Sequence, residues 1–189
     1  MITKNQIQFI KSLKFKKNRI KHQLFIVEGQ KNIKELLDSN YQYISIYATN
    51  SWMKLNKGIN ATYISDNELK SISNQKNPNE VLAIVKIKNY QTILNSGVVL
   101  VLDDINDPGN MGTILRICDW FGICQIVCSN NTVDIYNSKV VQSSMGSIFR
   151  VNVFYTNLSD YLLKIKTPIY GAFLDGKSIG DVSFPKNFH

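Results

Sequence analysis

Apolar residues in the first half of the chain form short runs, separated by polar segments with helical spacing. Four runs have the length and β-rich composition of strands: residues 23–27, 43–48, 61–65 and 81–87. Ile33, Leu36 and Leu37 recur at helical spacing and predict a helix over 30–38. Ser65 or Asp66 is expected to cap a further short helix. The alternation predicts a small α/β domain over residues 1–90.

The second half continues this alternation and begins with the most apolar run of the chain. Residues 98–102 (VVLVL) are unbroken and β-branched, as expected for a parallel strand that is buried on both faces. Further strands are predicted at 125–128, 151–155 and 169–174, and helical segments at 110–121, 137–149 and 158–165. Gly122 is a suitable left-handed stop for the first of these helices. The pattern predicts a second α/β domain with a parallel sheet over 98–189, joined to the first by 88–97, as a linker or a helix.

The chain has 22 Lys and Arg against 14 Asp and Glu, a net charge of +8, and the excess lies at the N-terminus. Seven basic residues precede the first acid, Glu28. Apolar residues with helical spacing run through this block, so we expect it to dock as a helix. Its positive field, over a Debye length of about 8 Å, suits nucleic acid. A solvated, flexible arm is the alternative interpretation. The basic residues predicted to bind are Lys14, Lys16, Lys17 and Arg19.

Other features of the composition exclude several classes of protein. The sequence has no run of apolar residues long enough to cross a membrane, and its N-terminus resembles neither a signal peptide nor a transit peptide. Cys118, Cys124 and Cys128 form no CxxC pair, and His22 and His189 are far apart, so no metal site is expected. Thiols in a reducing compartment are the better interpretation, and we expect a cytoplasmic protein without a membrane partner.

Residues 100–123 carry the most informative pattern. A buried strand is expected to end at Asp103, and a helix to begin near Asn110, which can cap it while presenting its amide. Ligands bind at the carboxyl ends of strands in open α/β sheets, so this loop is the best place for chemistry. Arg116 is unusual in an otherwise apolar helix. It is either a functional residue or a buried arginine paired with Asp103, Asp104 or Asp119, and composition does not separate the two.

Two rival motifs do not fit their surroundings. Residues 171–178 (GAFLDGKS) match a phosphate-binding loop, but 172–174 read as strand, and glycine and proline follow where a helix should start. Asp103, Asp104 and Asp107 spell DDxxD, which could hold Mg²⁺ on a diphosphate. That use needs a helix, whereas this run leaves a strand into a Pro-Gly turn. Neither nucleotide binding nor magnesium binding is therefore expected.

The pattern Asn-x-Gly-x-x-x-Arg followed by Cys-Asp-x-x-Gly, over residues 110–122, resembles the first signature motif of the SpoU (TrmH-like) RNA ribose 2'-O-methyltransferases of the SPOUT superfamily. Residues 139–154 resemble the segment that follows it there. Residues 24–39 and 72–85 are similar to the family's small RNA-binding domain, which is like ribosomal protein L30e. The resemblance thus covers nearly the whole chain.

The resemblance implies an L30e-like domain followed by an α/β-knot domain that transfers a methyl group from S-adenosylmethionine to a ribose 2'-hydroxyl of rRNA or tRNA. It assigns catalysis to Arg116 and Asn110 and the cofactor to Leu174 and Asp175, and it adds Glu28 to the RNA-binding residues. A homodimer is expected where the knot domain is complete.

The family continues after a segment like 170–179 with second and third motifs, whereas this sequence ends at FPKNFH. We therefore expect an incomplete knot domain that lacks the main cofactor motifs. The alternative function is a non-catalytic remnant that retains RNA binding.

Overall fold

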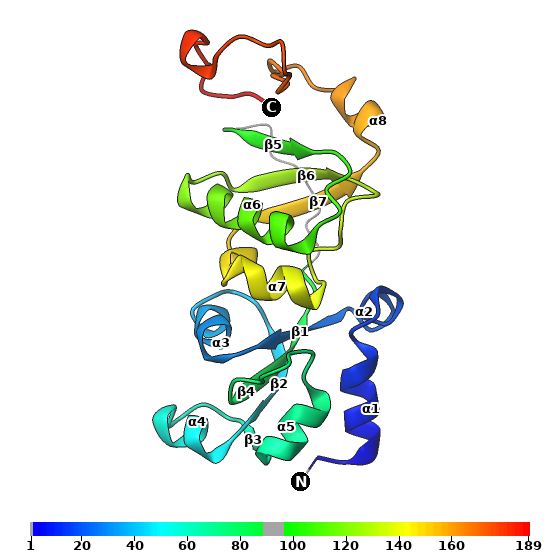
Figure 1. The fold of residues 1–189 in the computed structure, drawn as a ribbon, viewed down its shortest axis with the longest axis vertical. Helices are drawn as coiled ribbons and strands as arrows, with labels where there is room; N and C mark the ends of the chain where they lie inside the picture. The colour runs from blue at the N-terminus through cyan, green and yellow to red at the C-terminus, as the bar shows by residue number, and fades with distance from the viewer. Residues whose placement is uncertain (1, 89–96) are drawn as a thin grey trace.

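The computed structural model describes residues 2–88 and 97–189, and it contains two sheets that follow one another along the long axis of the molecule (Figure 1). The first sheet has the order β1-β4-β2-β3, in which β4 pairs antiparallel with both β1 and β2, and β3 pairs parallel with β2. Its strands are β1 (Leu24–Glu28), β2 (Tyr43–Ala48), β3 (Thr62–Tyr63) and β4 (Val81–Lys86). All four predicted strands are therefore present, although β3 is shorter than expected. Most of the predicted joining segment, 89–96, lies outside the described residues.

Five helices accompany the first sheet: α1 (Lys4–Ser12), α2 (Lys16–His22), α3 (Gln30–Leu37), α4 (Asn50–Leu55) and α5 (Asp66–Ile72). Thr3 caps α1 in a capping box with Gln6, and Ser65 caps α5 in a capping box with Glu68. These reciprocal hydrogen bonds satisfy N–H groups that a helix start otherwise leaves unpaired. The basic N-terminal block, predicted as a helix, thus forms two helices with a break between them.

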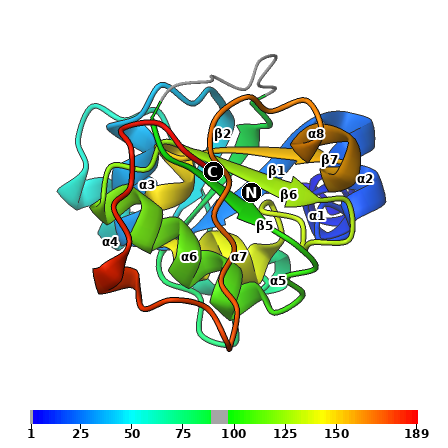
Figure 2. The ribbon, with the colours of Figure 1, turned by 90° about the horizontal axis from the view of Figure 1, so that it is seen from above.

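The second sheet is parallel, as predicted, with the order β5-β6-β7. Its strands are β5 (Val99–Leu102), β6 (Gln125–Ser129) and β7 (Asn152–Thr156). The helical elements of this half are α6 (Pro108–Trp120), α7 (Ser138–Ser144), the 3-10 helix η1 (Ser147–Phe149), α8 (Leu158–Leu162) and the 3-10 helix η2 (Ile179–Asp181). Figures 1 and 2 show that the carboxyl ends of β6 and β7 point toward the side of the molecule where α1 and α2 lie.

The prediction of a strand over 169–174 is wrong. Phe173 is 76% exposed, Leu174 is fully exposed, and the Gly176 N–H donates to the Phe173 carbonyl in a turn. The position beside β5 is taken by the segment around Phe188, which forms a parallel bridge with Val98. A strand needs both a ladder partner and a surface against which to bury its side chains. Tyr170 has both, because its N–H donates to the His189 carbonyl over 2.8 Å and its ring packs against Phe184 and Phe188, whereas the exposed Phe173 and Leu174 do not extend this pairing into a strand.

A shared core joins the two sheets. Helix α7 lies between them (Figure 1), and Val140 and Val141 of α7 belong to the same buried cluster as Phe25 of β1 and Leu36 of α3. A Cβ on Gly146, whose φ is +94°, would lie 2.4 Å from Cγ of Glu35, so this position requires glycine. The packing fixes the first half against the second. In the described part of the chain, no helix has the length and apolar character needed to cross a membrane.

Candidate functional site

Helix α6, which carries Asn110 and Arg116, begins at the carboxyl edge of the second sheet. The Asn110 backbone N–H donates to Asp107 Oδ1 over 2.7 Å, and Pro108 is the first helical residue. Asp107 is therefore the N-cap, and the prediction that Asn110 caps this helix is wrong. Aspartate followed by proline is a favourable helix start, because the carboxylate accepts from an unpaired N–H and proline has none to satisfy. The Asn110 side chain is exposed, with no hydrogen bond to other described residues.

The loop between β5 and α6 is held by the loop that follows β6. The Asp104 N–H donates to Ser129 Oγ over 2.9 Å, and the Val133 N–H donates to the Ile105 carbonyl over 2.8 Å. Thr132, which is 2% exposed, accepts from the Ile105 N–H over 3.4 Å. These hydrogen bonds hold the loops at the carboxyl ends of β5 and β6 together, and α6 begins at the end of the first of these loops.

Arg19 was predicted to contact RNA, but its side chain points into the protein and is 4% exposed. Its Nε and Nη2 donate to Asp134 Oδ2 over 3.1 and 2.6 Å, and its Nη1 donates to the carbonyls of Leu13 and Lys14. The guanidinium thus donates its hydrogen bonds to acceptors within the protein. The predicted direct contact of Arg19 with RNA is therefore replaced by a structural role. Because Asp134 lies in the loop after β6, Arg19 ties the basic helices to the carboxyl edge of the second sheet.

Glu28 needs the same correction. The residue is 6% exposed, and its carboxylate accepts hydrogen bonds from the Ser73 hydroxyl and, over 3.0 Å, from the Asn74 N–H. Burial raises the pKa of this carboxyl above its ordinary value, and the two hydrogen bonds oppose that shift. A buried carboxyl group that already accepts two hydrogen bonds within the protein cannot meet an RNA phosphate, so Glu28 acts on the turn at 73–74 instead.

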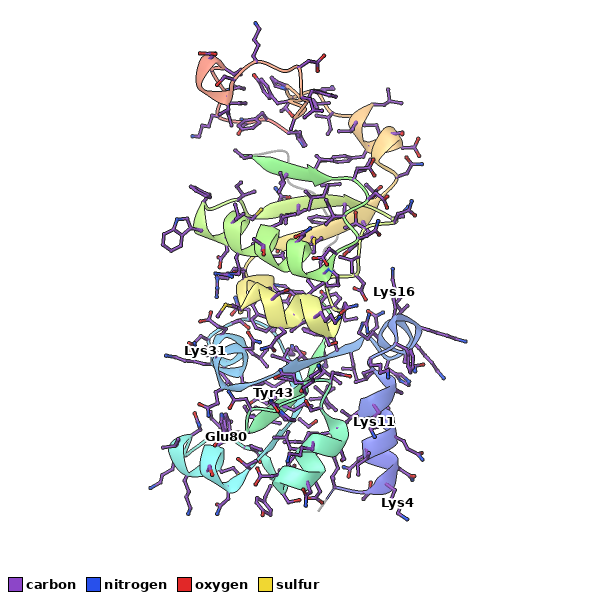
Figure 3. The ribbon with its side chains drawn as sticks, in the orientation of Figure 1. Lys4, Lys11, Lys16, Lys31, Tyr43 and Glu80 are labelled. Carbon is purple, nitrogen blue, oxygen red and sulfur yellow. The ribbon has the colours of Figure 1, made fainter. Side chains whose placement is uncertain are left out.

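The remaining predicted RNA contacts, Lys14, Lys16 and Lys17, are exposed. Figure 3 marks Lys11 on α1 and Lys16 on α2 at the same edge of the molecule. The α1–α2 corner therefore presents a group of ammonium ions to solvent next to the junction with the second sheet.

Arg116 lies on the exposed side of α6, and the prediction's alternative of a buried ion pair is wrong. Asp119, one of its suggested partners, instead accepts from Arg150 over 2.8–3.0 Å and from Ser147 Oγ over 2.8 Å. The hydrogen bond from Arg150 lowers the pKa of Asp119. Arg150 also pairs with Glu35 over 2.5 Å, so it bridges the two halves. Arg116 has no ion pair or hydrogen bond with any residue in 2–88 or 97–189.

A surface hollow of about 650 Å³ surrounds Arg116. Its apolar side chains are unusually exposed: Trp120 is 85% exposed, Phe121 73%, Ile117 49% and Met145 47%. Thr113, Asp119 and Ser147 complete the lining. The hollow combines one unpaired cation with a contiguous apolar surface, and it is open to solvent along α6.

Gly112 lets α6 approach α7 closely. A Cβ at this position would lie 2.0 Å from Ser143 Oγ and 2.8 Å from the Ser143 carbonyl carbon. Ser143 Oγ in turn hydrogen bonds to the Pro108 carbonyl over 3.1 Å. The glycine between Asn110 and Arg116 therefore sets the packing of the helix that presents both side chains.

Leu174 and Asp175, predicted to bind the cofactor, lie exposed in the turn that replaces the expected strand. An adenosyl ligand requires an enclosing surface with apolar walls. These two residues do not supply one in this arrangement, so their assignment stays a prediction that the geometry does not support.

Comparison with known proteins agrees with this architecture. The SpoU rRNA Methylase family matches residues 97–189, and the MRM3-like substrate binding domain matches residues 4–83. The 23S rRNA (guanosine(2553)-2'-O)-methyltransferase RlmP of Bacillus subtilis is 29% identical over 178 residues, which are 90% of this chain and 71% of that protein.

Solved structures give the same result. A structure of a TrmH-family protein from Porphyromonas gingivalis is 35% identical, with a TM-score of 0.88 over 98% of this chain and 76% of that one. An AdoMet-bound rRNA methyltransferase from Sinorhizobium meliloti, 22% identical, shares the fold with a TM-score of 0.84 over 100% of this chain and 77% of that one. The fold and the α6 motif thus define an RNA methylase of the SPOUT type. This chain belongs to the SpoU (TrmH-like) family.

Proposed function

We propose that this protein transfers a methyl group from S-adenosylmethionine to a ribose 2'-hydroxyl of RNA, and that rRNA is the substrate. One observation carries the proposal: Asn110 and Arg116 lie exposed, with no partner among the described residues, on a helix that starts at the carboxyl edge of a parallel sheet. Family membership supports the reaction, and the name of the RlmP relative favours rRNA over tRNA. Residues 1–90 would capture RNA and 98–189 would carry the transfer, in the cytoplasm.

Arg116 and Asn110 would act on different parts of one nucleotide. They are six residues apart on α6, which corresponds to about 9 Å along a helix axis. A guanidinium is a poor general base because it does not give up its proton in proteins, so Arg116 would stabilise the developing alkoxide and anchor the adjacent phosphate. Asn110, at the first turn, would orient the ribose through its amide. Holding the hydroxyl in line is itself worth several kcal/mol to such a transfer.

The apolar hollow around Arg116 supports the predicted homodimer. Monomeric proteins seldom expose a contiguous apolar surface of this kind without a partner. A second copy that covers Ile117, Trp120 and Phe121 would remove these side chains from water and leave Arg116 at the margin of the interface. An active site next to Arg116 would then be closed by the neighbouring copy.

The test is methyl transfer to deproteinised rRNA with radiolabelled S-adenosylmethionine, followed by digestion to nucleosides. We expect a 2'-O-methylated nucleoside with the wild-type protein and at least ~100-fold less with Arg116→Ala, the size of loss typical of one electrostatic donor. Label on a base rather than on ribose would contradict the proposal.

A non-catalytic RNA-binding protein is the second candidate, and the exposed position of Leu174 and Asp175 favours it. The same assay separates the two. A wild-type protein that binds rRNA tightly and transfers no label would support the RNA-binding function and reject the enzyme.

A further inference from the structure

Phe15 is an exposed aromatic residue at the corner between α1 and α2. It is 58% exposed and stands at the N-cap position of α2. The neighbouring apolar residues of this corner, Ile10 and Leu13, are buried in the core beneath α1. Lys14, Lys16 and Lys17 of this corner are predicted RNA contacts, whereas no role has yet been assigned to the Phe15 ring. A phenyl group held at the surface among cations needs a separate explanation.

Phe15 borders a hollow of about 520 Å³, and the residues that line it with Phe15 are polar or basic. The other lining residues are Gln8, Lys11, Ser12, Lys14, Ser73 and Asn74. Lys14 Nζ lies over the ring, 5.2 Å from its centroid. The hollow thus combines an aromatic ring, two ammonium ions and several hydrogen-bonding side chains, and its lining includes no acid.

Both walls of this hollow are fixed by buried charged residues. On one side, Arg19 donates to the Leu13 carbonyl over 3.0 Å and to the Lys14 carbonyl over 2.7 Å, which holds the backbone that carries Phe15. On the other side, the Glu28 carboxylate accepts from Ser73 and from the Asn74 N–H. A surface that is already ordered loses less conformational entropy when a ligand binds. Arg19 and Glu28 are therefore positioning residues for this hollow.

From these observations, we infer that Phe15 is a stacking platform for an unpaired base of the RNA, with Lys11 and Lys14 on the flanking phosphates. The inference rests on the proposed RNA-binding function and adds a residue and a mode of recognition to it. An aromatic ring next to cations suits single-stranded nucleic acid, because any base can stack and the backbone supplies the negative charge. The exposed Lys16 and Lys17 extend the positive surface along α2. Charge complementarity therefore favours a single-stranded RNA segment over an apolar protein partner.

The experiment measures binding of the full chain to a fluorescent single-stranded oligoribonucleotide over a range of salt concentrations. Phe15→Ala should weaken binding about tenfold, within the range measured for loss of one base–aromatic stack, and leave the slope of log Kd against log salt unchanged. Phe15→Trp should bind at least as tightly as wild type. Ile20→Ala is the matched control, because Ile20 is 55% exposed on the same helix pair and should have no effect.

A second readout reports on stacking itself. An oligoribonucleotide containing 2-aminopurine should lose fluorescence on binding to the wild-type protein, and the loss should be smaller with Phe15→Ala. Wild-type affinity in Phe15→Ala, or an equal loss in Ile20→Ala, would overturn the inference while RNA binding and methylation stand. A wild-type protein that binds no RNA would overturn both this inference and the proposed function.

Discussion

Two of the three arginines form ion pairs between the two halves of the chain, and the third lies exposed on α6. Arg19 and Arg150 each pair with a carboxylate from a distant part of the chain, Arg19 in a buried pair and Arg150 in a half-exposed one. On α6, Arg116 has no partner among the described residues and is surrounded by exposed apolar side chains. The residue type is the same, yet its surroundings differ in both charge and packing.

The comparison separates arginines that hold the fold from an arginine that remains available for a ligand. A guanidinium with its donors consumed by carboxylates and carbonyls contributes to the fixed arrangement of the two halves. A guanidinium with open donors on the exposed side of a helix is available for an anion, because its planar fork matches phosphate geometry. The same distinction applies to Lys14, Lys16 and Lys17, which are exposed, and to Arg19 beside them, which is not.

The largest expected effect is on stability, from removal of Arg19. Arg19→Met leaves Asp134, which is 16% exposed, without its cation, and loss of one partner of a buried pair costs about 3–5 kcal/mol. Urea unfolding should show this loss at unchanged m-value. Arg150→Met is the control, since the Arg150 side chain is 46% exposed and its loss should cost roughly 1 kcal/mol or less.

The double variant Arg19→Met with Asp134→Leu should recover most of the stability, because neither charge is then left unpaired. If Arg19→Met unfolds at the wild-type urea concentration, the junction is not held by this pair, and the contrast with Arg116 fails.

The next largest effect concerns the exposed apolar side chains that surround Arg116 on α6. Trp120→Glu should shift a dimer to monomer in sedimentation velocity, since loss of a central aromatic residue from an interface costs about 2–4 kcal/mol. Tyr63→Glu is the control, because Tyr63 is another exposed aromatic residue, at 53%, but lies on the first sheet. Equal behaviour of the two variants would contradict the assignment of the α6 face to the interface.

Gly112→Ala should be destabilising by about 1–3 kcal/mol, the usual cost of overpacking, because the added methyl group meets Ser143 at 2.0 Å. The shift of α6 that relieves this contact should also lower methyl transfer. Thr113→Ala, on the exposed side of the same helix, should stay within about 0.5 kcal/mol of wild type. A Gly112→Ala protein with wild-type melting temperature would show that α6 and α7 are not in such close contact.

The smallest expected effect is a difference in pH dependence between two carboxylates. Burial raises the pKa of Glu28 above its value in the unfolded chain. Its contribution to the free energy of unfolding is therefore fully present below the unfolded pKa and is lost as the pH rises through the folded pKa. The hydrogen bond from Arg150 lowers the pKa of Asp119 below its value in the unfolded chain. Its contribution to the free energy of unfolding is therefore fully present above the unfolded pKa and is lost as the pH falls through the folded pKa.

Melting curves between pH 3 and 7 test both signs. Relative to wild type, Glu28→Gln should gain stability as the pH rises through this range, and Asp119→Asn should lose it. Parallel curves for the two variants would contradict the assigned environments.

Much of the fold could be predicted from the sequence because strands leave a local signal. The β-rich runs at 43–48 and 98–102 coincide with β2 and β5 to within one residue. Gly122, with φ +71°, ends α6 as its position indicated. The sequence also contains the signal for the cap at Asp107, since aspartate before proline is a known helix start, although the motif drew the prediction to Asn110.

The errors concern partners that are distant in sequence. Arg19 and Asp134 are 115 residues apart, so no local pattern indicates that Arg19 is buried. Glu28 reaches Ser73 across 45 residues, for the same reason. The composition of 169–174 predicts a strand, but composition does not reveal whether a ladder position beside β5 is free. The sequence does not indicate that Phe15 is exposed, because the exposure of its ring depends on how α1 and α2 fold against each other.

The most direct test of the account is the single-turnover rate of methyl transfer by Arg116→Lys, measured with its melting temperature on the same preparation. Lysine keeps the charge and loses the planar fork. We predict a rate at least ~100-fold below wild type and an unchanged melting temperature, because Arg116 makes no ion pair or hydrogen bond within the described residues. A variant that melts early and transfers the methyl group at the wild-type rate would contradict the account, since Arg116 would then be a structural residue like Arg19.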